Sequence, residues 1–180
     1  MLNPILWKTK RENKSLVFVL NTAMKNIKFI LFAPCFLIAL SGCSQNQMDT
    51  YNKLTPQEER VLLKKATDAP FTGEYYQKKD NGIYICRRCN APLYNSADKF
   101  DSHCGWPSFD DEIKGAVKRI NDADGQRTEI ICNNCGGHLG HVFLGEGFTS
   151  KETRHCVNTS SIRFIPADSV STLPAVIHSK

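Results

Sequence analysis

Two copies of a cysteine turn, Cys86-x-x-Cys89 and Cys132-x-x-Cys135, constrain this chain more than any other feature. Each copy follows an isoleucine, and a leucine stands four residues after its second cysteine. The two-residue spacer lets both sulfurs of a turn face one point, and two such turns supply the four thiolates that structural zinc prefers. The sequence therefore predicts one structural zinc ion held by Cys86, Cys89, Cys132 and Cys135.

Two alternatives for these turns remain open at this stage. A thioredoxin-like redox pair opens a helix within a βαβ unit, and neither turn has that context. Disulfides are the second alternative, because six cysteines remain once Cys35 and Cys43 are set aside, and six can form about fifteen different sets of disulfides. The doubled spacing favours zinc over both.

The first 42 residues have the layout of an export signal. Lys25 and Lys28 precede an apolar run at 29–40, which is too short to span a bilayer as a helix. The run ends in Leu-Ser-Gly-Cys43, which resembles the bacterial lipobox. That resemblance implies cleavage before Cys43, a lipid on this cysteine, and an exported, membrane-anchored lipoprotein that faces the periplasm or the cell exterior.

Two other interpretations of the leader stay open. The apolar run could remain uncleaved as an N-terminal anchor, with an unmodified Cys43. Met24 stands directly before Lys25, so a protein that starts at Met24 and lacks residues 1–23 is also consistent with the sequence.

The charge of the chain argues against a nucleic-acid partner. The formal net charge is +5, from 23 basic and 18 acidic residues. Six of the bases and one of the acids lie in residues 1–42, which leaves 17 of each in the remainder. A neutral domain without a basic block lacks the electrostatic footprint of nucleic-acid binding.

Local patterns predict a small, mainly antiparallel β domain over residues 54–166. Thr55, Pro56 and Glu58 form a capping-box pattern that predicts an N-terminal helix at 56–66. Short extended runs follow at 83–85, 116–120, 128–131, 142–144, 155–157 and 162–165, and the turn at 122–125 predicts a hairpin. Residues 43–53 are predicted to be a polar tether, and residues 167–180 a loosely held tail.

The two cysteines outside the doubled turns, Cys104 and Cys156, are candidates for chemistry. Arg154 and His155 precede Cys156, and nearby positive charge lowers the pKa of a thiol and makes it a better nucleophile. An inert, buried cysteine in a strand is the alternative for Cys156 taken alone.

Two further segments carry candidate site residues. His138 and His141, separated by a glycine that we expect to form a turn, are candidate proton donors, with Phe143 beside them as a pocket residue. Cys104 stands in a tight turn beside Trp106, whose ring would suit a methyl or thioether group. Each of these residues is equally consistent with a structural role when considered singly.

Five motifs in this order resemble the B-type methionine sulfoxide reductases. They are the two cysteine turns, Cys104-Gly-Trp-Pro-Ser-Phe109, His138-Leu-Gly-His-Val-Phe143 and Arg154-His-Cys-Val-Asn158. The resemblance implies a mainly β fold of two sheets, with a structural zinc remote from the catalytic cysteine, and reduction of the R epimer of methionine sulfoxide in oxidised proteins.

The same resemblance implies individual roles. Cys156 matches the nucleophile, which becomes a sulfenic acid, and Cys104 matches the resolving cysteine that forms a disulfide with it. His138, His141 and Asn158 match residues that bind or protonate the substrate oxygen, and Trp106 matches the residue that receives the methyl group. A thioredoxin-like donor would reduce the disulfide of a monomeric enzyme.

Two residues depart from the usual pattern of this family. His103 stands where glycine is frequent, and His155 stands where an aromatic residue is frequent. We expect both to be tolerated, with an effect of His155 on the ionisation of Cys156 left open.

Two other classes of function remain as alternatives. A non-catalytic zinc-binding surface lipoprotein would have no use for the histidines and the extra cysteines. A thiol–disulfide exchanger normally carries its redox pair in a Cys-x-x-Cys turn, and neither Cys104 nor Cys156 lies in one.

Overall fold

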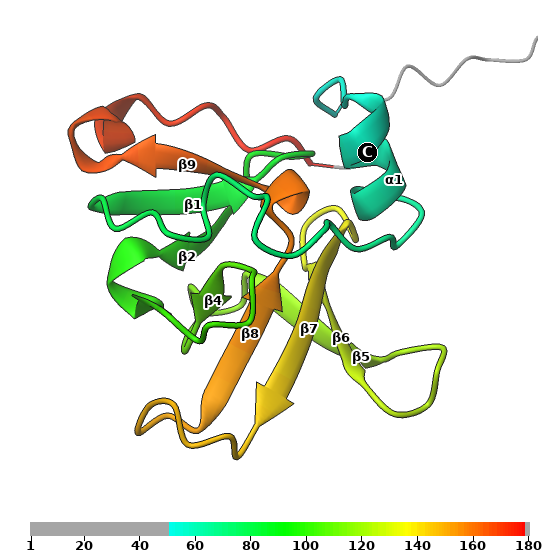
Figure 1. Ribbon diagram of the computed structural model, residues 1–180. Coiled ribbons are helices and arrows are strands. Elements are labelled where there is room, and N and C mark those ends of the chain that lie inside the picture. The colour runs from blue at the N-terminus through cyan, green and yellow to red at the C-terminus, as the bar shows by residue number, and fades with distance from the viewer. Residues whose placement is uncertain (1–50, 179–180) are drawn as a thin grey trace, which may run out of the picture. The chain divides into compact units, whose positions relative to one another are not determined.

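Two antiparallel sheets and one short α-helix make up residues 51–178, the part of the chain that the computed structural model describes (Figure 1). The predicted signal segment 1–42 and Cys43 lie outside the described residues. The mainly β fold of two antiparallel sheets predicted above is confirmed.

The smaller sheet has three strands in the order β2-β1-β9. Its members are β1 (Gly82–Cys86), β2 (Pro92–Asn95) and β9 (Ile162–Pro166). The larger sheet has six strands in the order β3-β4-β8-β7-β6-β5. Its members are β3 (Lys99–Phe100), β4 (Ser108–Phe109), β5 (Val117–Asn121), β6 (Thr128–Cys132), β7 (His138–Leu144) and β8 (Thr153–Val157). Three 3-10 turns, η1 (Ser96–Asp98), η2 (Thr159–Ser161) and η3 (Ala167–Thr172), link or follow the strands.

Aromatic rings join the two sheets into one core. Tyr84 of β1 contacts Phe109 of β4 edge to face, with ring centroids 5.0 Å apart. Tyr94 of β2 stacks on the same Phe109 at 4.3 Å. All three rings are fully buried, and aromatic pairs of this kind contribute about 0.5–1.5 kcal/mol each beyond the area they bury. The core therefore holds β4 and its neighbour β8 firmly against the smaller sheet.

The N-terminal helix is shorter than its pattern predicts. The predicted capping box is present, because Thr55 and Glu58 exchange hydrogen bonds at the start of α1 (Pro56–Leu62). The helix was predicted to continue to residue 66 and instead ends at Leu62. Lys65 takes a left-handed conformation with φ 57°, which turns the chain away from the helix axis.

Gly140 was predicted to form a turn and instead lies inside β7. Its φ is +151°, and a Cβ at this position would lie 2.0 Å from the carbonyl oxygen of Cys156. Only glycine lets β7 approach β8 this closely, beside the candidate nucleophile. The register of β6 against β7 also shifts next to Ile130, the partner of Gly140, which marks a bulge in the sheet.

The C-terminal tail is held more tightly than its composition predicts. The backbone N–H of Ile177 donates to the carbonyl of Cys89 at 2.9 Å, and the Asn134 side chain donates to the carbonyl of Ile177 at 2.7 Å. The side chain of Asn90 donates to the carbonyl of Ala175 at 3.0 Å. Residues 175–177 of the predicted tail thus form backbone hydrogen bonds with Cys89 and Asn90 at the first cysteine turn and with Asn134 inside the second.

No helix within residues 51–178 is long and apolar enough to cross a membrane.

Candidate active site and zinc site

The two cysteine turns converge on one point and have the same local geometry. Cys86 ends β1 and Cys132 ends β6, and the residues after each turn, Asn90 and Gly136, both take left-handed conformations. The N–H of Asn90 donates to the carbonyl of Cys86 at 2.9 Å, and that of Gly136 donates to the carbonyl of Cys132 at 2.8 Å. This repeated backbone hydrogen bond makes each turn a rigid pair of ligands.

The four sulfurs fit zinc. Their Sγ atoms all lie within 4.8 Å of one another, and two of the pairs, Cys86–Cys135 and Cys89–Cys132, are 3.6 Å apart. A tetrahedron with Zn–S bonds of about 2.3 Å has sulfur–sulfur edges of about 3.8 Å. The predicted structural zinc site is therefore confirmed, and four protein thiolates complete its coordination.

The sulfurs of this quartet titrate together. Hydrogen bonds with Cys132 raise the pKa of Cys86 and Cys135 and lower the pKa of Cys89, and a hydrogen bond with Cys135 lowers the pKa of Cys132. Since zinc binds thiolates, binding of the ion would displace the thiol protons that remain in the quartet.

The second pair of cysteines comprises Cys156 on β8 and Cys104 in the loop between β3 and β4. The Sγ atoms of Cys104 and Cys156 are 3.9 Å apart. Ser108 of β4 pairs with Cys156 of β8, which places Cys104, four residues before Ser108, beside the strand that carries Cys156. The two sulfurs need only a small movement to reach the disulfide bond length of about 2.05 Å.

Hydrogen bonds divide the charge of this pair unevenly. The bond with Cys156 is the largest cause that lowers the pKa of Cys104 to about 4, and hydroxyl donors on Ser102 (2.9 Å) and Ser108 (3.5 Å) lower it further. The same bond, followed by burial, raises the pKa of Cys156, although the guanidinium of Arg154 opposes this. Arg154 thus acts to lower the pKa of Cys156, as expected, but the hydrogen bond with Cys104 and burial outweigh it, and the pair holds one thiolate that is centred on Cys104.

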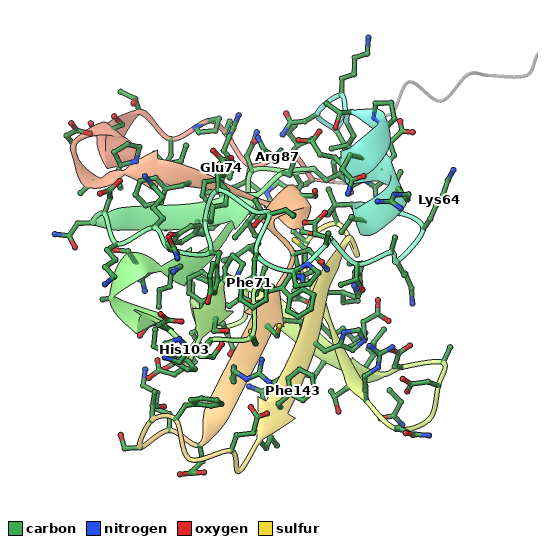
Figure 2. The ribbon with its side chains drawn as sticks, in the orientation of Figure 1. Lys64, Phe71, Glu74, Arg87, His103 and Phe143 are labelled. Atoms are coloured by element: carbon green, nitrogen blue, oxygen red, sulfur yellow. The ribbon has the colours of Figure 1, made fainter. Side chains whose placement is uncertain are left out.

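Cys156 also lines a cavity of about 110 Å³. The other residues around it are Thr67, Trp106, Arg127, Gly140, His141, Phe143 and Asn158. The volume exceeds the roughly 30 Å³ that one water occupies in the liquid, so a group of a few heavy atoms fits. Five predicted site residues (Cys156, Trp106, His141, Phe143, Asn158) thus meet at one hollow, whose labelled member Phe143 faces the viewer in Figure 2.

The two histidines of β7 have different partners. Nε2 of His141 lies 2.6 Å from the carboxylate of Asp122, and this hydrogen bond is the main cause that lowers the pKa of Asp122. Since a carboxylate only accepts, Nε2 carries the proton, and Nδ1 of His141 is free to exchange a proton with the cavity. Arg127 also contacts Asp122, at 3.0 Å, so the β5–β6 hairpin forms one side of the hollow.

His138 and Glu129 form a buried pair, which the exposed Lys65 joins from the surface. Its Nδ1 lies 2.7 Å from Glu129, which in turn receives a hydrogen bond of 2.7 Å from Lys65. The side chains of His138 and Glu129 are 2% and 1% exposed. Burial lowers the pKa of His138, and burial also acts to raise that of Glu129, but the donors Lys65 and His138 outweigh it and lower the Glu129 pKa.

Nε2 of His138 is buried and makes no hydrogen bond within residues 51–178. The rings of His138 and His141 lie 5.6 Å apart, edge to face. His141 therefore lines the cavity, and His138 lies behind it, in contact with the His141 ring.

Trp106 and Asn158 are both held by one residue that sequence reasoning missed. The indole N–H of Trp106 donates to the backbone carbonyl of Asp68 at 2.9 Å, and the side-chain oxygen of Asn158 accepts from the Asp68 N–H at 2.9 Å. Asp68 stands just after the predicted helix at 56–66 and before Ala69-Pro70. No local signal predicts that an acid there is buried against the pocket.

The two family departures lie away from the cavity. His103 is exposed, as Figure 2 shows, and lies near Asp101. His155 is fully buried on the face of β8 opposite Cys156, between the Tyr94 hydroxyl (3.2 Å) and Arg119 (3.1 Å). Burial, with the charge of Arg119, lowers the pKa of His155 to about 4 and keeps it neutral.

The chain matches a known domain family and several curated proteins. The SelR domain family matches residues 54–166. Peptide methionine sulfoxide reductase B2, chloroplastic, of Arabidopsis thaliana is 55% identical over 114 residues, which cover 63% of this chain and 56% of that protein. Peptide methionine sulfoxide reductase B5 of Oryza sativa subsp. japonica is 50% identical over 128 residues, which cover 71% of this chain and 94% of the relative.

A third relative, peptide methionine sulfoxide reductase B3 of Arabidopsis thaliana, is 54% identical over 117 residues, which cover 64% of this chain and 66% of its own length. The chain thus spans little more than half of the B2 protein but nearly all of the rice B5 protein. The matched range contains both cysteine turns, Cys104 and Cys156. The chain therefore belongs to the SelR domain family, the family of the B-type peptide methionine sulfoxide reductases.

Proposed function

We propose that this protein reduces the R epimer of methionine sulfoxide in oxidised proteins, with Cys156 as the nucleophile and Cys104 as the resolving cysteine. The observation that carries the proposal is the position of Cys156. Its sulfur lines a small cavity with Trp106 and Phe143 and lies 3.9 Å from the sulfur of Cys104. An apolar wall suits a methyl group, and the adjacent thiol suits a two-electron redox cycle.

The first step transfers oxygen from the substrate to Cys156. As the substrate binds, the proton of Cys156 passes to the Cys104 thiolate, and the Cys156 sulfur attacks the sulfoxide sulfur. The sulfur of Cys156 loses two electrons and becomes a sulfenic acid, while the substrate sulfur gains two electrons and leaves as methionine. This order explains why the resting thiolate can be centred on Cys104 while Cys156 carries out the attack.

His141 supplies the proton that the substrate oxygen takes up. Its Nε2 is held by Asp122, and its Nδ1 carries a proton to give when the imidazole is protonated. His138, neutral because burial lowers its pKa, orients His141 and the bound oxygen together with the remaining N–H of Asn158.

The second step regenerates the thiols. The Cys104 sulfur attacks the Cys156 sulfenic acid, a Cys104–Cys156 disulfide forms, and the hydroxyl leaves with the Cys104 proton as water. A thioredoxin-like donor then reduces the disulfide with two electrons and is itself oxidised. Zinc takes no part in these steps and stabilises the joined ends of the two sheets.

We further propose that the protein acts as a monomer outside the cytoplasm, anchored by a lipid on Cys43. The support is the sequence alone, in which Lys25 and Lys28 precede an apolar run and a Leu-Ser-Gly-Cys ending. Incorporation of a labelled fatty acid that disappears in Cys43→Ser tests the anchor, and light scattering of the detergent-solubilised protein tests the monomer.

The decisive experiment offers the purified protein each epimer of a methionine sulfoxide peptide with dithiothreitol. We expect turnover of the R epimer only, and its loss in Cys156→Ser. Turnover of the S epimer, or R-epimer turnover that persists in Cys156→Ser, contradicts the proposal. A zinc-binding lipoprotein without catalysis would show no turnover, and a thiol–disulfide exchanger would instead reduce a protein disulfide such as those of insulin.

A further inference from the structure

Asp68 lies in the loop between α1 and β1 and is buried, with 7% of its surface exposed. Three hydrogen bonds fix its carboxylate. Oδ2 accepts from the N–H of Ser160 at 2.8 Å, and Oδ1 accepts from the Ser160 hydroxyl at 2.7 Å and from the Gln57 amide at 2.8 Å. A buried carboxylate needs several hydrogen-bond donors, because its burial without them costs free energy.

The backbone of Asp68 forms hydrogen bonds with two residues that line the cavity. Its carbonyl accepts from the indole N–H of Trp106, and its N–H donates to the side-chain oxygen of Asn158, both at 2.9 Å. Trp106 and Asn158 come from segments separated by more than fifty residues, yet one residue sets where each of them lies relative to the other. Thr67, the preceding residue, lines the cavity itself.

The other contacts that hold this loop lie to either side of Asp68, beginning with the ion pair of Lys65 and Glu129 at 2.7 Å. Residues 64–72 lie outside any helix or strand. On either side of Asp68, the N–H of Ala66 donates to the carbonyl of Arg60 at 3.1 Å, and the N–H of Phe71 donates to the carbonyl of Gly105 at 2.8 Å. The position of the Asp68 backbone therefore depends on the grip of its carboxylate on Ser160 and Gln57.

The carboxylate does not reach the reacting atoms. Neither of its oxygens lines the cavity, and both are engaged by Ser160. A role as an acid or base in the reaction is thus not open to it.

From these contacts we infer that Asp68 is a positioning residue, which clamps the indole of Trp106 and the amide of Asn158 in the geometry that accepts a methyl sulfoxide group. The predicted effect on turnover rests on the proposed function. The predicted effect on the position of Trp106 rests on the contacts alone. Loss of the clamp lets the loop shift, and a shift of about 1 Å at a pocket wall is enough to reduce catalytic efficiency about a hundredfold.

The test uses Asp68→Asn in a Trp7→Phe background of the full chain. Trp7 and Trp106 are the two tryptophans of the sequence, so the fluorescence of this background reports on Trp106 alone. The amide nitrogen of the new side chain replaces either Oδ1 or Oδ2. In both cases its N–H groups face a donor of Ser160 or Gln57, so a hydrogen bond to that residue is lost. We expect the Trp106 emission to move to longer wavelength as the indole gains water, and KM for an R-sulfoxide peptide to rise about tenfold, with a smaller change in kcat.

Glu58→Gln is the matched control. Glu58 caps the same helix that carries Gln57 and contacts Arg87 at 3.0 Å, but it makes no contact with Asp68. This variant weakens the same end of the domain, so a general loss of stability would appear in both variants. We expect Glu58→Gln to leave KM and the Trp106 emission as in the background protein.

A folded Asp68→Asn with unchanged emission and unchanged KM overturns the inference, as does an equal rise in KM in Glu58→Gln. Should Asp68→Asn fail to fold, Ser160→Ala is the second test, because it removes the hydroxyl donor to Oδ1 and keeps the backbone donor to Oδ2. A smaller shift of the Trp106 emission and a smaller rise in KM support the clamp. The absence of both changes overturns it. A background protein without turnover refutes the proposed function, while the emission shift still reports on the clamp.

Discussion

The sulfur of Cys104 lies 3.9 Å from the sulfur of Cys156 and accepts the hydroxyl hydrogen of Ser102 at 2.9 Å. Cys104 therefore has the greater support from hydroxyl donors, and Cys156 is the one of the two that lines the cavity. The division gives each sulfur a separate task, since the charge rests on one and the access to substrate belongs to the other.

Removal of the resolving thiol should stop the cycle after one round. In Cys104→Ser we expect one methionine released per protein from an R-sulfoxide peptide, and then no recycling by a thioredoxin-like donor, because no disulfide can form. Methionine is measured by chromatography after mixing in single-turnover and excess-substrate conditions. Continued turnover with thioredoxin at the wild-type rate would refute the resolving role.

The ionisation of Cys104 should be visible in its alkylation. A pKa of about 4 means that the thiolate persists at all pH values above that point and is lost only as the pH falls through it. The rate at which iodoacetamide labels Cys104, followed by peptide mass spectrometry, should therefore be flat between pH 5.5 and 8.

Removal of the hydrogen bonds to Cys104 should change this profile. With Ser102→Ala and Cys156→Ala combined, the pKa of Cys104 should return toward about 8.5, so labelling becomes slow at pH 6 and accelerates as the pH rises. A flat profile in the double variant would show that other groups hold the thiolate.

The buried His155 should make the protein sensitive to acid without altering the pH profile of catalysis. Its pKa is depressed to about 4, so the folded state resists a proton that the unfolded chain takes up near pH 6.5. Its contribution to stability is complete above pH 6.5 and is lost as the pH falls from 6.5 to 4, with a size of roughly 3 kcal/mol.

His155→Phe should flatten this dependence. We expect a smaller slope of the free energy of unfolding, measured in urea between pH 4.5 and 6.5, although the hydroxyl of Tyr94 and the guanidinium of Arg119 lose a partner. The pH profile of turnover should stay in place because the ring faces away from Cys156. A shifted profile would indicate that His155 acts on the nucleophile after all.

The tail should slow the loss of zinc. Asn134 donates to the carbonyl of Ile177 from inside the second cysteine turn, and loss of such a hydrogen bond costs about 1 kcal/mol. Asn134→Ala should release zinc to a coloured chelator about five times faster than the unmodified protein. Asn133→Ala is the control, since the Asn133 side chain donates to Gly115 instead; equal acceleration in both variants would exclude a specific role of the tail.

Local sequence signals predict the zinc ligands because both ligands of each turn lie within four residues. They also predict β1, β5, β6 and β8 to within a few residues, since each is a short extended run beside turn residues. β3 and β4 are too short, at two residues each, to show any alternation. A periodic pattern needs more residues than these strands contain.

The buried charges could not be predicted in the same way. Glu129 contacts Lys65 across 64 residues, and Asp68 contacts Ser160 across 92 residues. Each acid looks like an ordinary surface residue in the sequence, and only the folded chain supplies the donors that make its burial favourable. The direction of the Cys156 pKa shift was missed for the same reason, because its main cause is a residue 52 positions away.

Residues 175–177 form hydrogen bonds with Cys89 and Asn90 at the first cysteine turn and with Asn134 inside the second. The first turn ends a strand of the smaller sheet, and the second ends a strand of the larger one. This short segment thus bridges the two sheets on the outside of the zinc site, so loosening the bridge and opening the metal site should be coupled events.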